Sequence, residues 1–456
     1  MEAPKTPPKS AVQSLRPFIT VSLYIVVSTL VTLWLSGPSL RQIIGYSLLL
    51  AIGFVAFLGS LLVLYYAPLE GRLKLALGLI ILVILLPVMG VQNTFLFEVA
   101  TQVGIFAALA LGLNIVVGFA GLLDLGYVAF YAVGAYLWAI VGSNQGNIAF
   151  GTDIFPLAPV WFFPFLAIAV GVAAMTGILL GLPVLRLRGD YLAIVTLAFG
   201  EVIRVVVNNL DKPINLTNGP QGIRAIQRPP LFFKPALTAL GLNVDDATLY
   251  SLYFYFLVLL IVGMAVVITR RLEGSWVGRA WTAIREDELA AQAMGIPLVR
   301  MKLAAFAAGA SFAGAMGMIF GAKQYFINPE SFTFMESIGV LSMVIVGGMG
   351  SIPGAIVGAT VVTILNLQVL KGLSLLLNQL RGTGAVIPLI NYPLAQWPTQ
   401  LDPAKYERLV FGVLLVIMSI LRPQGIIPER RHQLELAERP APAAVAAPTP
   451  GGGDDD

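Results

Sequence analysis

The feature that most constrains this chain is the repetition of long stretches without a charged residue, such as 75–97, 99–123 and 125–152. A helix needs about 20 mostly apolar residues to cross the hydrocarbon of a bilayer, and each of these stretches is long enough. Hydrophobic residues make up 57% of the chain and charged residues only 11%, whereas a soluble domain carries about 25% charged residues. The sequence therefore predicts an all-α polytopic protein embedded in the lipid bilayer.

We expect about 10 to 12 transmembrane helices, some of them core helices interrupted by glycine. The predicted crossings are 17–36, 43–66, 75–91, 98–118, 121–142, 158–185, 190–208, 249–269, 301–322, 335–348, 352–370 and 407–421. The positive-inside rule sets their direction. With the N-terminus in the cytoplasm, the basic residues of the short loops also face the cytoplasm; these are Arg72, Lys74, Arg186, Arg188 and Arg422. Both termini are then cytoplasmic.

Composition divides the chain into four parts. Residues 1–16 form a short, polar cytoplasmic segment without a cleavage site after the first apolar run, so we expect that run to be retained as a helix. Residues 17–92 supply ordinary Leu, Val and Ile helices, which we interpret as extra N-terminal transmembrane helices. Residues 93–428 are rich in Gly and Ala, which allow close helix packing in membranes, and are predicted to be the working core. Residues 429–456 are predicted to be a disordered cytoplasmic tail.

Two glycine-rich segments interrupt the core helices. In 116–121 (VVGFAG), Gly118 and Gly121 break an apolar helix, and 345–350 (IVGGMG) repeats the pattern. Paired glycine-interrupted segments in two halves of a chain point to a transport path built from repeats. With six residues compared, chance is an equal alternative.

Three charged side chains fall within or beside predicted crossings. Asp124 follows the first break, and an intramembrane carboxylate suggests a functional group. The interpretation we favour instead is that Asp124 caps the next helix near the cytoplasmic interface. Glu201 and Arg204 are spaced i, i+3 on one helical face and can pair. We favour a structural ion pair over a role in lining a path or in gating.

The most informative hydrophilic stretch is 270–302, which the charge rule places in the cytoplasm. Val277, Trp281 and Ile284 share one face at helical spacing, so an amphipathic helix is expected there. We predict that Glu286 and Asp287 then open a second short helix, where they suit the positive end of its dipole, and that Gly295 and Pro297 stop it. Such a helix either docks onto a soluble motor protein or lies on the lipid headgroups.

Residue types needed for hydrolysis or metal binding are missing from the sequence. The chain has no cysteine, and its one histidine, His432, lies in the predicted tail. No G-x-x-x-x-G-K-[ST] loop that would hold nucleotide phosphates is present. We therefore predict a protein that is not an enzyme and has no metal or cofactor of its own.

Four blocks resemble the permease subunits of branched-chain amino-acid ABC importers, most closely the LivM type. They are 112–136 (GLNIVVGFAGLLDLGYVAFYAVGAY), 189–223, 278–295 (GRAWTAIREDELAAQAMG) and 338–359 (IGVLSMVIVGGMGSIPGAIVGA). The resemblance implies that the short helix in 270–302 is a coupling helix that sits in a cleft of an ATPase. Its implied docking residues are Arg285, Glu286, Asp287, Glu288, Ala290, Ala291 and Gly295. The residues that we assign to the translocation path are Asn114, Gly118, Gly121, Asp124, Tyr127, Glu201, Arg204, Gly347, Gly348 and Gly350.

The resemblance also implies a set of partners and a location. The partners are a LivH-like second permease subunit, two LivG/LivF-like ATPases that bind the ATP and Mg, and a periplasmic amino-acid-binding protein. The location is the bacterial inner membrane, and no nucleic acid is involved. The substrate class, branched-chain amino acids, rests on the family alone, so the urea or amide branch of the same family is an alternative. An alternative from another class is a self-contained secondary transporter driven by an ion gradient, which would need ligands such as Glu98, Asp124, Glu201 or Arg204.

Overall fold

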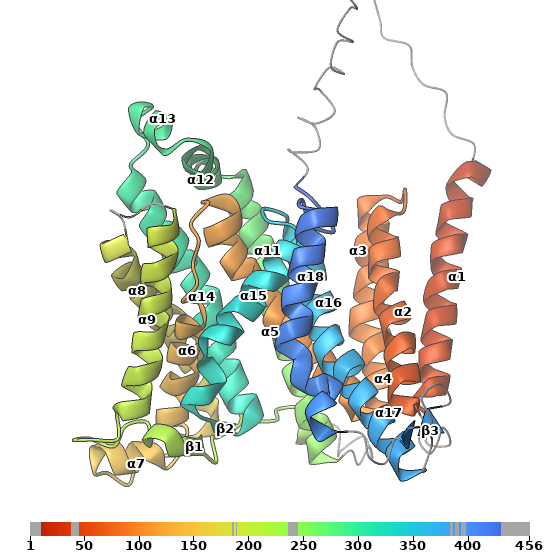
Figure 1. Cartoon of the computed structure of the whole chain (residues 1–456), viewed down its shortest axis with the longest axis horizontal. Coiled ribbons are helices and arrows are strands. Elements are labelled where there is room, and N and C mark those ends of the chain that lie inside the picture. Colours follow the sequence, from red (N-terminus) through yellow and green to blue (C-terminus); the bar gives the residue numbers. More distant parts are fainter. Residues whose placement is uncertain are drawn as a thin grey trace, which may run out of the picture.

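The computed structural model describes residues 11–37, 45–184, 187, 189–235, 245–383, 386–387, 392–393 and 398–429. Within them the fold consists of long helices that run roughly side by side (Figure 1). The long helical elements are α1 (Ala11–Leu35), α2 (Tyr46–Tyr66), α3 (Gly71–Ile80), α4 (Leu86–Gln92), α5 (Thr94–Asn114), α6 (Val128–Val141), α8 (Phe162–Val184), α9 (Asp190–Asn209), α11 (Asp246–Gly274), α14 (Leu298–Gln324), α15 (Phe334–Gly347), α16 (Ile352–Ile364), α17 (Lys371–Gly382) and α18 (Glu407–Leu421).

Short elements connect these helices. Three π-helical turns continue longer helices: η2 (Ile81–Leu85), η3 (Ile115–Phe119) and η7 (Leu365–Leu370). The remaining short helices are α7 (Gln145–Phe150), α12 (Trp276–Glu286), α13 (Glu288–Ala293), η4 (Pro159–Trp161), η5 (Gly219–Gln221), η6 (Pro329–Phe332), η9 (Thr399–Leu401) and η10 (Pro403–Tyr406). Two antiparallel pairs of two-residue strands join loops, β1 (Ile223–Arg224) with β2 (Phe326–Ile327) and β3 (Val386–Ile387) with β4 (Tyr392–Pro393).

The two ends of the helix bundle differ. The helices α12 and α13 lie at one end, at the top of Figure 1, and we call this the α12 end. The helix α7 and the strands lie at the other end, which we call the strand end. The helix α1 begins at the α12 end, and α18 also ends there (Figure 1). The first and last described residues are therefore on the same side of the bundle as α12.

The helices confirm the predicted all-α, multi-pass membrane fold. Ten helices in the described part of the chain are long and apolar enough to cross a membrane. The shorter α6 has 14 residues and α18 has 15, and both run alongside the longer helices in Figure 1. Of the predicted N-terminal segment 1–16, residues 11–16 belong to α1, and residues 1–10 lie outside the described residues. Of the predicted tail 429–456, Glu429 is described and forms an ion pair, and residues 430–456 lie outside.

Two predicted crossings have different bounds in the structure. The crossing predicted at 121–142 is helical only from Val128, because Gly121 has a φ of +68° and the backbone after it is extended. The crossing predicted at 352–370 continues through η7 and α17 to Gly382. That extension packs on α2: the side-chain oxygen of Gln379 accepts a hydrogen bond from the Gly45 amide at 3.0 Å. Contact with another helix keeps the chain helical beyond the point where its apolar run ends.

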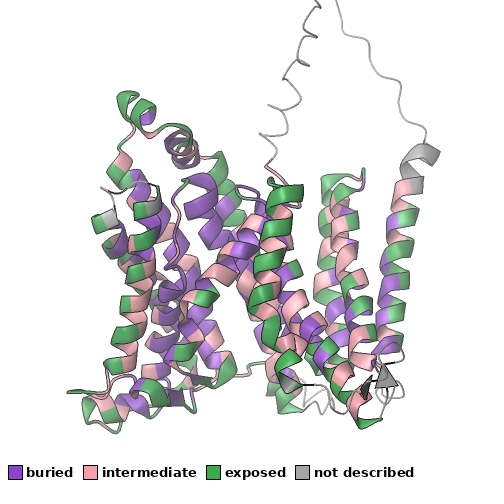
Figure 2. Cartoon of the chain, viewed as in Figure 1, coloured by how far each residue is buried: buried purple, intermediate pink, exposed green. Residues whose placement is uncertain are grey.

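The centre of the bundle is formed by α5, α6 and α14, where buried residues are concentrated (Figure 2). Glycines let these helices touch backbone to backbone. A methyl group on Gly317 of α14 would lie 1.9 Å from the carbonyl oxygen of Tyr131 on α6, and one on Gly134 would lie 2.0 Å from the carbonyl oxygen of Gly314. Only glycine fits at these positions, so the Gly-rich composition of the core follows from its packing.

The first four helices have a hydrophobic cluster of their own. Phe54 and Phe57 of α2 and Met89 of α4 are completely buried in it. Tyr255 of α11 joins this cluster, and its hydroxyl donates to the carbonyl of Leu82 at 2.7 Å. The N-terminal helices therefore pack on the rest of the bundle through the start of α5, through α11, and through η7 and α17.

This packing makes a prediction for Gly317. The substitution Gly317→Leu should lower the free energy of unfolding by about 1–3 kcal/mol or more, because α6 and α14 must move apart to admit the side chain. The control is Gly171→Leu on α8, where no atom lies within 4 Å of the added Cβ. Thermal unfolding in detergent should show a lower midpoint for Gly317→Leu only; equal midpoints would contradict the close contact.

Candidate functional site

The helix α5 ends in a break that the glycines of 116–121 make possible. The π-helical turn η3 follows Asn114, and the chain then leaves the helix at Gly121, whose φ of +68° favours glycine. Residues 121–126 run as an extended, non-helical segment from the α12 end back into the bundle, where α6 begins (Figure 1). The predicted interruption is confirmed at Gly121, whereas Gly118 lies within the π-helical turn η3.

Neighbouring helices supply hydrogen-bond partners for the extended segment. The Leu125 amide donates to the hydroxyl of Thr196 on α9 at 3.0 Å, and the Val128 amide donates to the hydroxyl of Ser337 on α15 at 3.2 Å. The Tyr127 hydroxyl is buried and donates to the carbonyl of Gly309 on α14 at 2.9 Å. Non-helical backbone at membrane depth is tolerated only where protein or a cavity satisfies it. The Thr196 and Ser337 hydroxyls therefore satisfy two backbone amides, and the Tyr127 side chain fixes the segment to α14.

Asp124 lies in this extended segment and is fully buried. One carboxylate oxygen accepts a hydrogen bond from the Gly126 amide at 2.9 Å, and the other has no hydrogen-bond partner. Our favoured interpretation, a cap on the next helix, is therefore wrong. The helix α6 begins at Val128 with no side-chain cap. The Asp124 carboxylate instead accepts its hydrogen bond from the Gly126 amide, which lies before the helix starts. The unpaired oxygen leaves a functional role for this carboxylate open to experiment.

The second glycine-rich segment meets the first. The side-chain oxygen of Asn114 accepts a hydrogen bond from the Gly350 amide at 2.8 Å. A methyl group on Gly118 would lie 2.5 Å from the same amide nitrogen. The carbonyl of Gly347 accepts from the Ile427 amide at 3.0 Å, so the segment that follows α18 is fixed to the same place. The two segments with similar sequence thus lie against each other at the α12 end.

The helix α12 is attached to the bundle by its apolar face. Trp281 and Ile284 are buried, and Val277 packs against them at the edge of the core. The Trp281 ring nitrogen donates to the carbonyl of Met301 at the start of α14 at 2.8 Å. The predicted amphipathic helix is confirmed, and its position is fixed by a large side chain that is both packed and hydrogen-bonded.

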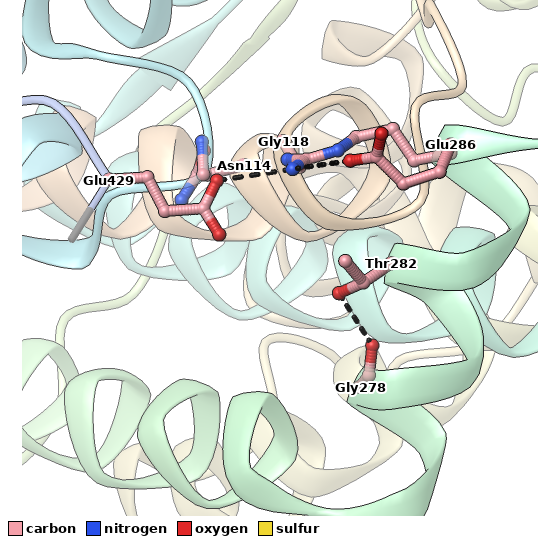
Figure 3. Close-up of polar contacts among 8 residues, drawn as sticks. Asn114, Gly118, Gly278, Thr282, Glu286 and Glu429 are labelled. Atoms are coloured by element: carbon pink, nitrogen blue, oxygen red, sulfur yellow. Dashed lines mark hydrogen bonds and ion pairs between the residues drawn. The ribbon is translucent and has the colours of Figure 1, made fainter. Parts of the chain in front are cut away.

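Arg285 joins α12 to the end of α5 and to the segment that follows α18. One guanidinium nitrogen donates to the carbonyl of Gly118, and the other lies 3.2 Å from the carboxylate of Glu429 and 3.6 Å from that of Glu286. Figure 3 shows Glu286 and Glu429 approaching Asn114 and Gly118 from opposite sides. A cation suits this place because the last carbonyls of a helix carry the negative end of its dipole.

We call this set of residues the junction: Asn114, Gly118, Gly121, Arg285, Gly350 and Glu429. It contains residues that we assigned to two different functions. Arg285 was predicted to be a docking residue, and the structure directs its side chain into the bundle. A methyl group on Gly121 would lie 2.7 Å from that side chain. Glu429 was missed, because it lies 144 residues from Arg285 and nothing in the local sequence predicts that pairing.

The helix α13 projects from the α12 end (Figure 1). Its N-terminus is capped by Asp287, whose carboxylate accepts hydrogen bonds from the Leu289 amide at 2.8 Å and the Ala290 amide at 3.0 Å. Glu286 is the last residue of α12, so the second helix begins two residues later than predicted. The chain leaves α13 at Gly295, whose φ is +83°. The short helix and its predicted stop are confirmed.

The predicted docking residues divide into two groups on α13. Ala291 is buried, and Glu288 pairs with the nearly buried Lys302 at 2.8 Å, so both hold α13 on α14. Ala290 and Gly295 are exposed. The largest exposed side chains on this helix and its turn are Leu289, with 62% of its surface exposed, and Met294, with 84%. Neither side chain is among the predicted docking residues.

Glu201 and Arg204 form the ion pair that we favoured. The Arg204 side chain donates to the Glu201 carboxylate at 2.9 Å, and it lies 3.6 Å from the carboxylate of Glu330 in η6. Both side chains are about one-third exposed. The charged groups that they contact are on α9 and η6, so the structure does not bring them into the junction.

Metal binding finds no support in the described part of the chain. Among those residues, no group of three or more His, Cys, Asp or Glu side chains lies close enough to hold an ion.

The junction makes a prediction for Asn114. Replacing it with leucine leaves the buried Gly350 amide without an acceptor, which should cost about 1–3 kcal/mol of unfolding free energy. Asn209→Leu is the control, because its side chain is exposed and bonds only within α9. Chemical unfolding of the purified protein measures both. Equal stability of the two variants would show that the Asn114–Gly350 contact does not hold the junction.

Comparisons with known proteins agree on one family. The family described as "Branched-chain amino acid transport system / permease component" matches residues 95–419. The chain is 38% identical to the high-affinity branched-chain amino acid transport system permease protein LivM of Escherichia coli, covering 79% of this chain and 76% of that protein. It is also 38% identical to LivM of Salmonella typhimurium, covering 74% and 71%.

Similarity to the LivH permease protein of Salmonella typhimurium is lower, at 23% identity over 58% of this chain and 82% of that protein. No solved structure matches the chain. The family match covers more than half of the chain, and the LivM similarity covers most of both sequences. The chain therefore belongs to the family of branched-chain amino acid transport system permease components.

Proposed function

We propose that this protein is the membrane-spanning permease subunit of an ATP-driven importer for branched-chain or closely related amino acids. It forms part of the translocation path, and separate subunits hydrolyse the ATP. Membership of the permease family and the similarity to two LivM proteins support this function. Permeases of this family are transport subunits, so the protein itself is not an enzyme.

One observation supports the coupling part of the proposal. The helix α13 presents the apolar side chains of Leu289 and Met294 beyond the end of the bundle. An exposed apolar patch rimmed by charged groups is typical of a protein-binding surface. Such a surface at the α12 end suits a cleft on a soluble ATPase, with Asp287 and Glu286 at its rim.

The junction would transmit the motion of an ATPase to the core. A push on α13 moves α12, since the two helices follow each other with only Asp287 between them. Arg285 then pulls on the Gly118 carbonyl at the end of α5, and through Glu429 on the segment that follows α18. Both glycine-rich segments move with it. Packed interfaces change between discrete arrangements rather than deforming continuously. This motion would therefore switch the translocation path from open toward the periplasm to open toward the cytoplasm.

The proposed partners follow from the same assignment. A LivH-like permease completes the membrane part, and the weaker similarity of this chain to LivH is consistent with two related subunits. Two ATPases hold ATP and Mg, and a periplasmic binding protein delivers the substrate at the strand end. The α12 end then faces the cytoplasm of a bacterial inner membrane, together with both chain termini.

An ion-driven secondary transporter is the competing function. It needs charged groups within the membrane that are free to bind an ion. Glu201 is paired with Arg204, and Glu98 lies 2.5 Å from Lys323, so both carboxylates are neutralised by a cation. Asp124 is the candidate that keeps an unpaired oxygen.

Reconstituted uptake separates the two functions. We expect vesicles that contain this chain, the second permease and the ATPase pair to accumulate leucine only with ATP and a loaded binding protein. Uptake by this chain alone under an ion gradient would refute the proposal. Urea or amide uptake in place of leucine would move the protein to another branch of the same family.

The docking surface makes a second prediction. The double substitution Leu289→Arg with Met294→Arg should abolish co-purification of the ATPase pair, because it replaces the exposed apolar surface with two charges that must be desolvated.

Arg285→Gln should leave that association intact and lower the amount of leucine imported per ATP hydrolysed. Co-purification and the ratio of uptake to ATPase activity measure the two effects.

The control for this experiment is Arg279→Gln, an exposed residue of α12 that donates to the carbonyl of Gly274. It removes a positive charge from the same helix without touching the junction. ATPase binding by the doubly substituted chain would show that α13 is not the docking surface. Unchanged coupling in Arg285→Gln would show that the junction does not transmit motion.

A further inference from the structure

A cavity of about 350 Å³ lies in the half of the bundle nearer the strand end. Its walls come from α5, α6, α15, α18 and the helix formed by α16 and η7. The helices α15 and α18 both begin at the strand end (Figure 1), and their first turns line the cavity. Ligand pockets in proteins have volumes of about 300–1,000 Å³. The cavity is therefore large enough for a small ligand.

Three charged side chains line this cavity, two acidic and one basic. Glu336 comes from the first turn of α15, and Glu407 and Arg408 come from the first turn of α18. Glu336 lies within electrostatic range of both other groups. Charged side chains in membrane-spanning segments are costly and mark substrate or ion pathways. The surplus of one negative charge favours a ligand that carries a positive group.

Further polar groups face the same space. The Glu407 carboxylate accepts a hydrogen bond from the side-chain amide of Asn366 on η7. Thr363 lines the cavity and is only 2% exposed, yet its hydroxyl has no hydrogen-bond partner. Buried polar groups almost always have a partner, so an unsatisfied hydroxyl in a cavity wall is a position where a ligand atom can bind.

Most of the other side chains of the wall are apolar. Phe106 of α5, Val340 and Met343 of α15 and Phe411 of α18 all line the cavity. A larger cavity of about 580 Å³ elsewhere in the bundle is bordered almost entirely by aliphatic side chains of α2, α5, α11 and α16. It offers a charged ligand no partners. The smaller cavity combines both acidic and basic groups with an apolar surface.

We propose that this cavity binds a zwitterionic α-amino acid with an apolar side chain. Glu336 and Glu407 bind the α-ammonium group, Arg408 binds the α-carboxylate, and Phe106, Val340 and Met343 contact the aliphatic side chain. The assignment rests on the proposed function, because it places the imported substrate on the translocation path, between the strand end and the junction. It identifies three residues of the path that the sequence patterns did not select.

A thiol-labelling experiment tests the cavity directly. The chain has no cysteine, and Gly339 lines the cavity with no atom within 4 Å of an added Cβ, so Gly339→Cys introduces a single reporter. In the assembled complex without ATP, leucine should slow labelling of this thiol by a membrane-impermeant methanethiosulfonate roughly twofold or more, compared with sucrose at the same concentration. Gly382→Cys, exposed at the end of α17, is the control and should be labelled at the same rate in leucine and in sucrose.

Uptake by charge-neutral variants provides the second measurement. Glu336→Gln, Glu407→Gln and Arg408→Gln should each reduce ATP-dependent leucine uptake about tenfold, because each removes a charge-assisted hydrogen bond to the substrate. Co-purification of the second permease and the ATPase pair shows that each variant assembles. Glu330→Gln is the matched control, since this side chain is 71% exposed and lies beside Arg204 outside the cavity.

The outcomes separate the two proposals. Absence of leucine uptake by the unsubstituted complex would refute the proposed function. The cavity assignment alone would be refuted if that complex imports leucine normally, leucine does not protect the thiol of Gly339→Cys, and the three charge variants also import leucine normally. Protection of the thiol by leucine supports the cavity even if one of the charge variants fails to assemble.

Discussion

The structure depends on the requirement that every backbone polar group at membrane depth has a hydrogen-bond partner. Residues 121–126 cannot meet that requirement through helical hydrogen bonds, because they form a non-helical segment between α5 and α6. Two neighbouring helices supply acceptors for backbone amides here, the hydroxyls of Thr196 and Ser337, and a third helix accepts a hydrogen bond from the Tyr127 side chain through the carbonyl of Gly309. An unsatisfied group in hydrocarbon costs several kcal/mol. The positions of α9, α14 and α15 around the segment are therefore as constrained as the segment itself.

Glycine makes this arrangement possible in a second way. A side chain can reach the extended backbone only if the helices that carry it come very close. A methyl group on Gly126 would lie 2.0 Å from the carbonyl oxygen of Thr196, and one on Gly112 would lie 2.1 Å from the Tyr127 hydroxyl. The same close approach excludes lipid and water from the core. Hydrogen bonding and small-residue packing thus depend on each other here.

Much of the fold could be predicted from the sequence because a membrane restricts the choices. A long apolar run must be a helix, and the break at Gly121 followed from residue type. The start of α6 at Val128 could not be predicted, since the extended backbone before it depends on partners from distant helices. The extension of the crossing after Leu370 into α17 depended in the same way on contact with α2.

The candidate site could be predicted only in part. Amphipathic spacing identified α12 through Trp281 and Ile284, and the short helix after it. The direction of Arg285 could not be read from spacing, because the Gly118 carbonyl and Glu429 are far away in the sequence. The charged wall formed by Glu336, Glu407 and Arg408 was missed for a similar reason. Each of these residues stands near the end of an apolar run, where a charge is ordinary, and only the fold brings them together.

The two ends of the bundle are connected by the same pair of helices. At the α12 end, Asn114 of α5 bonds to Gly350, which follows α15. Nearer the strand end, Phe106 of α5 and Glu336 and Val340 of α15 line the proposed substrate cavity. A shift of α15 along α5 would therefore alter the junction and the cavity together. In the proposed cycle, an ATPase acting on α12 needs no separate relay to reach the substrate, because the helices that it moves are the walls of the cavity.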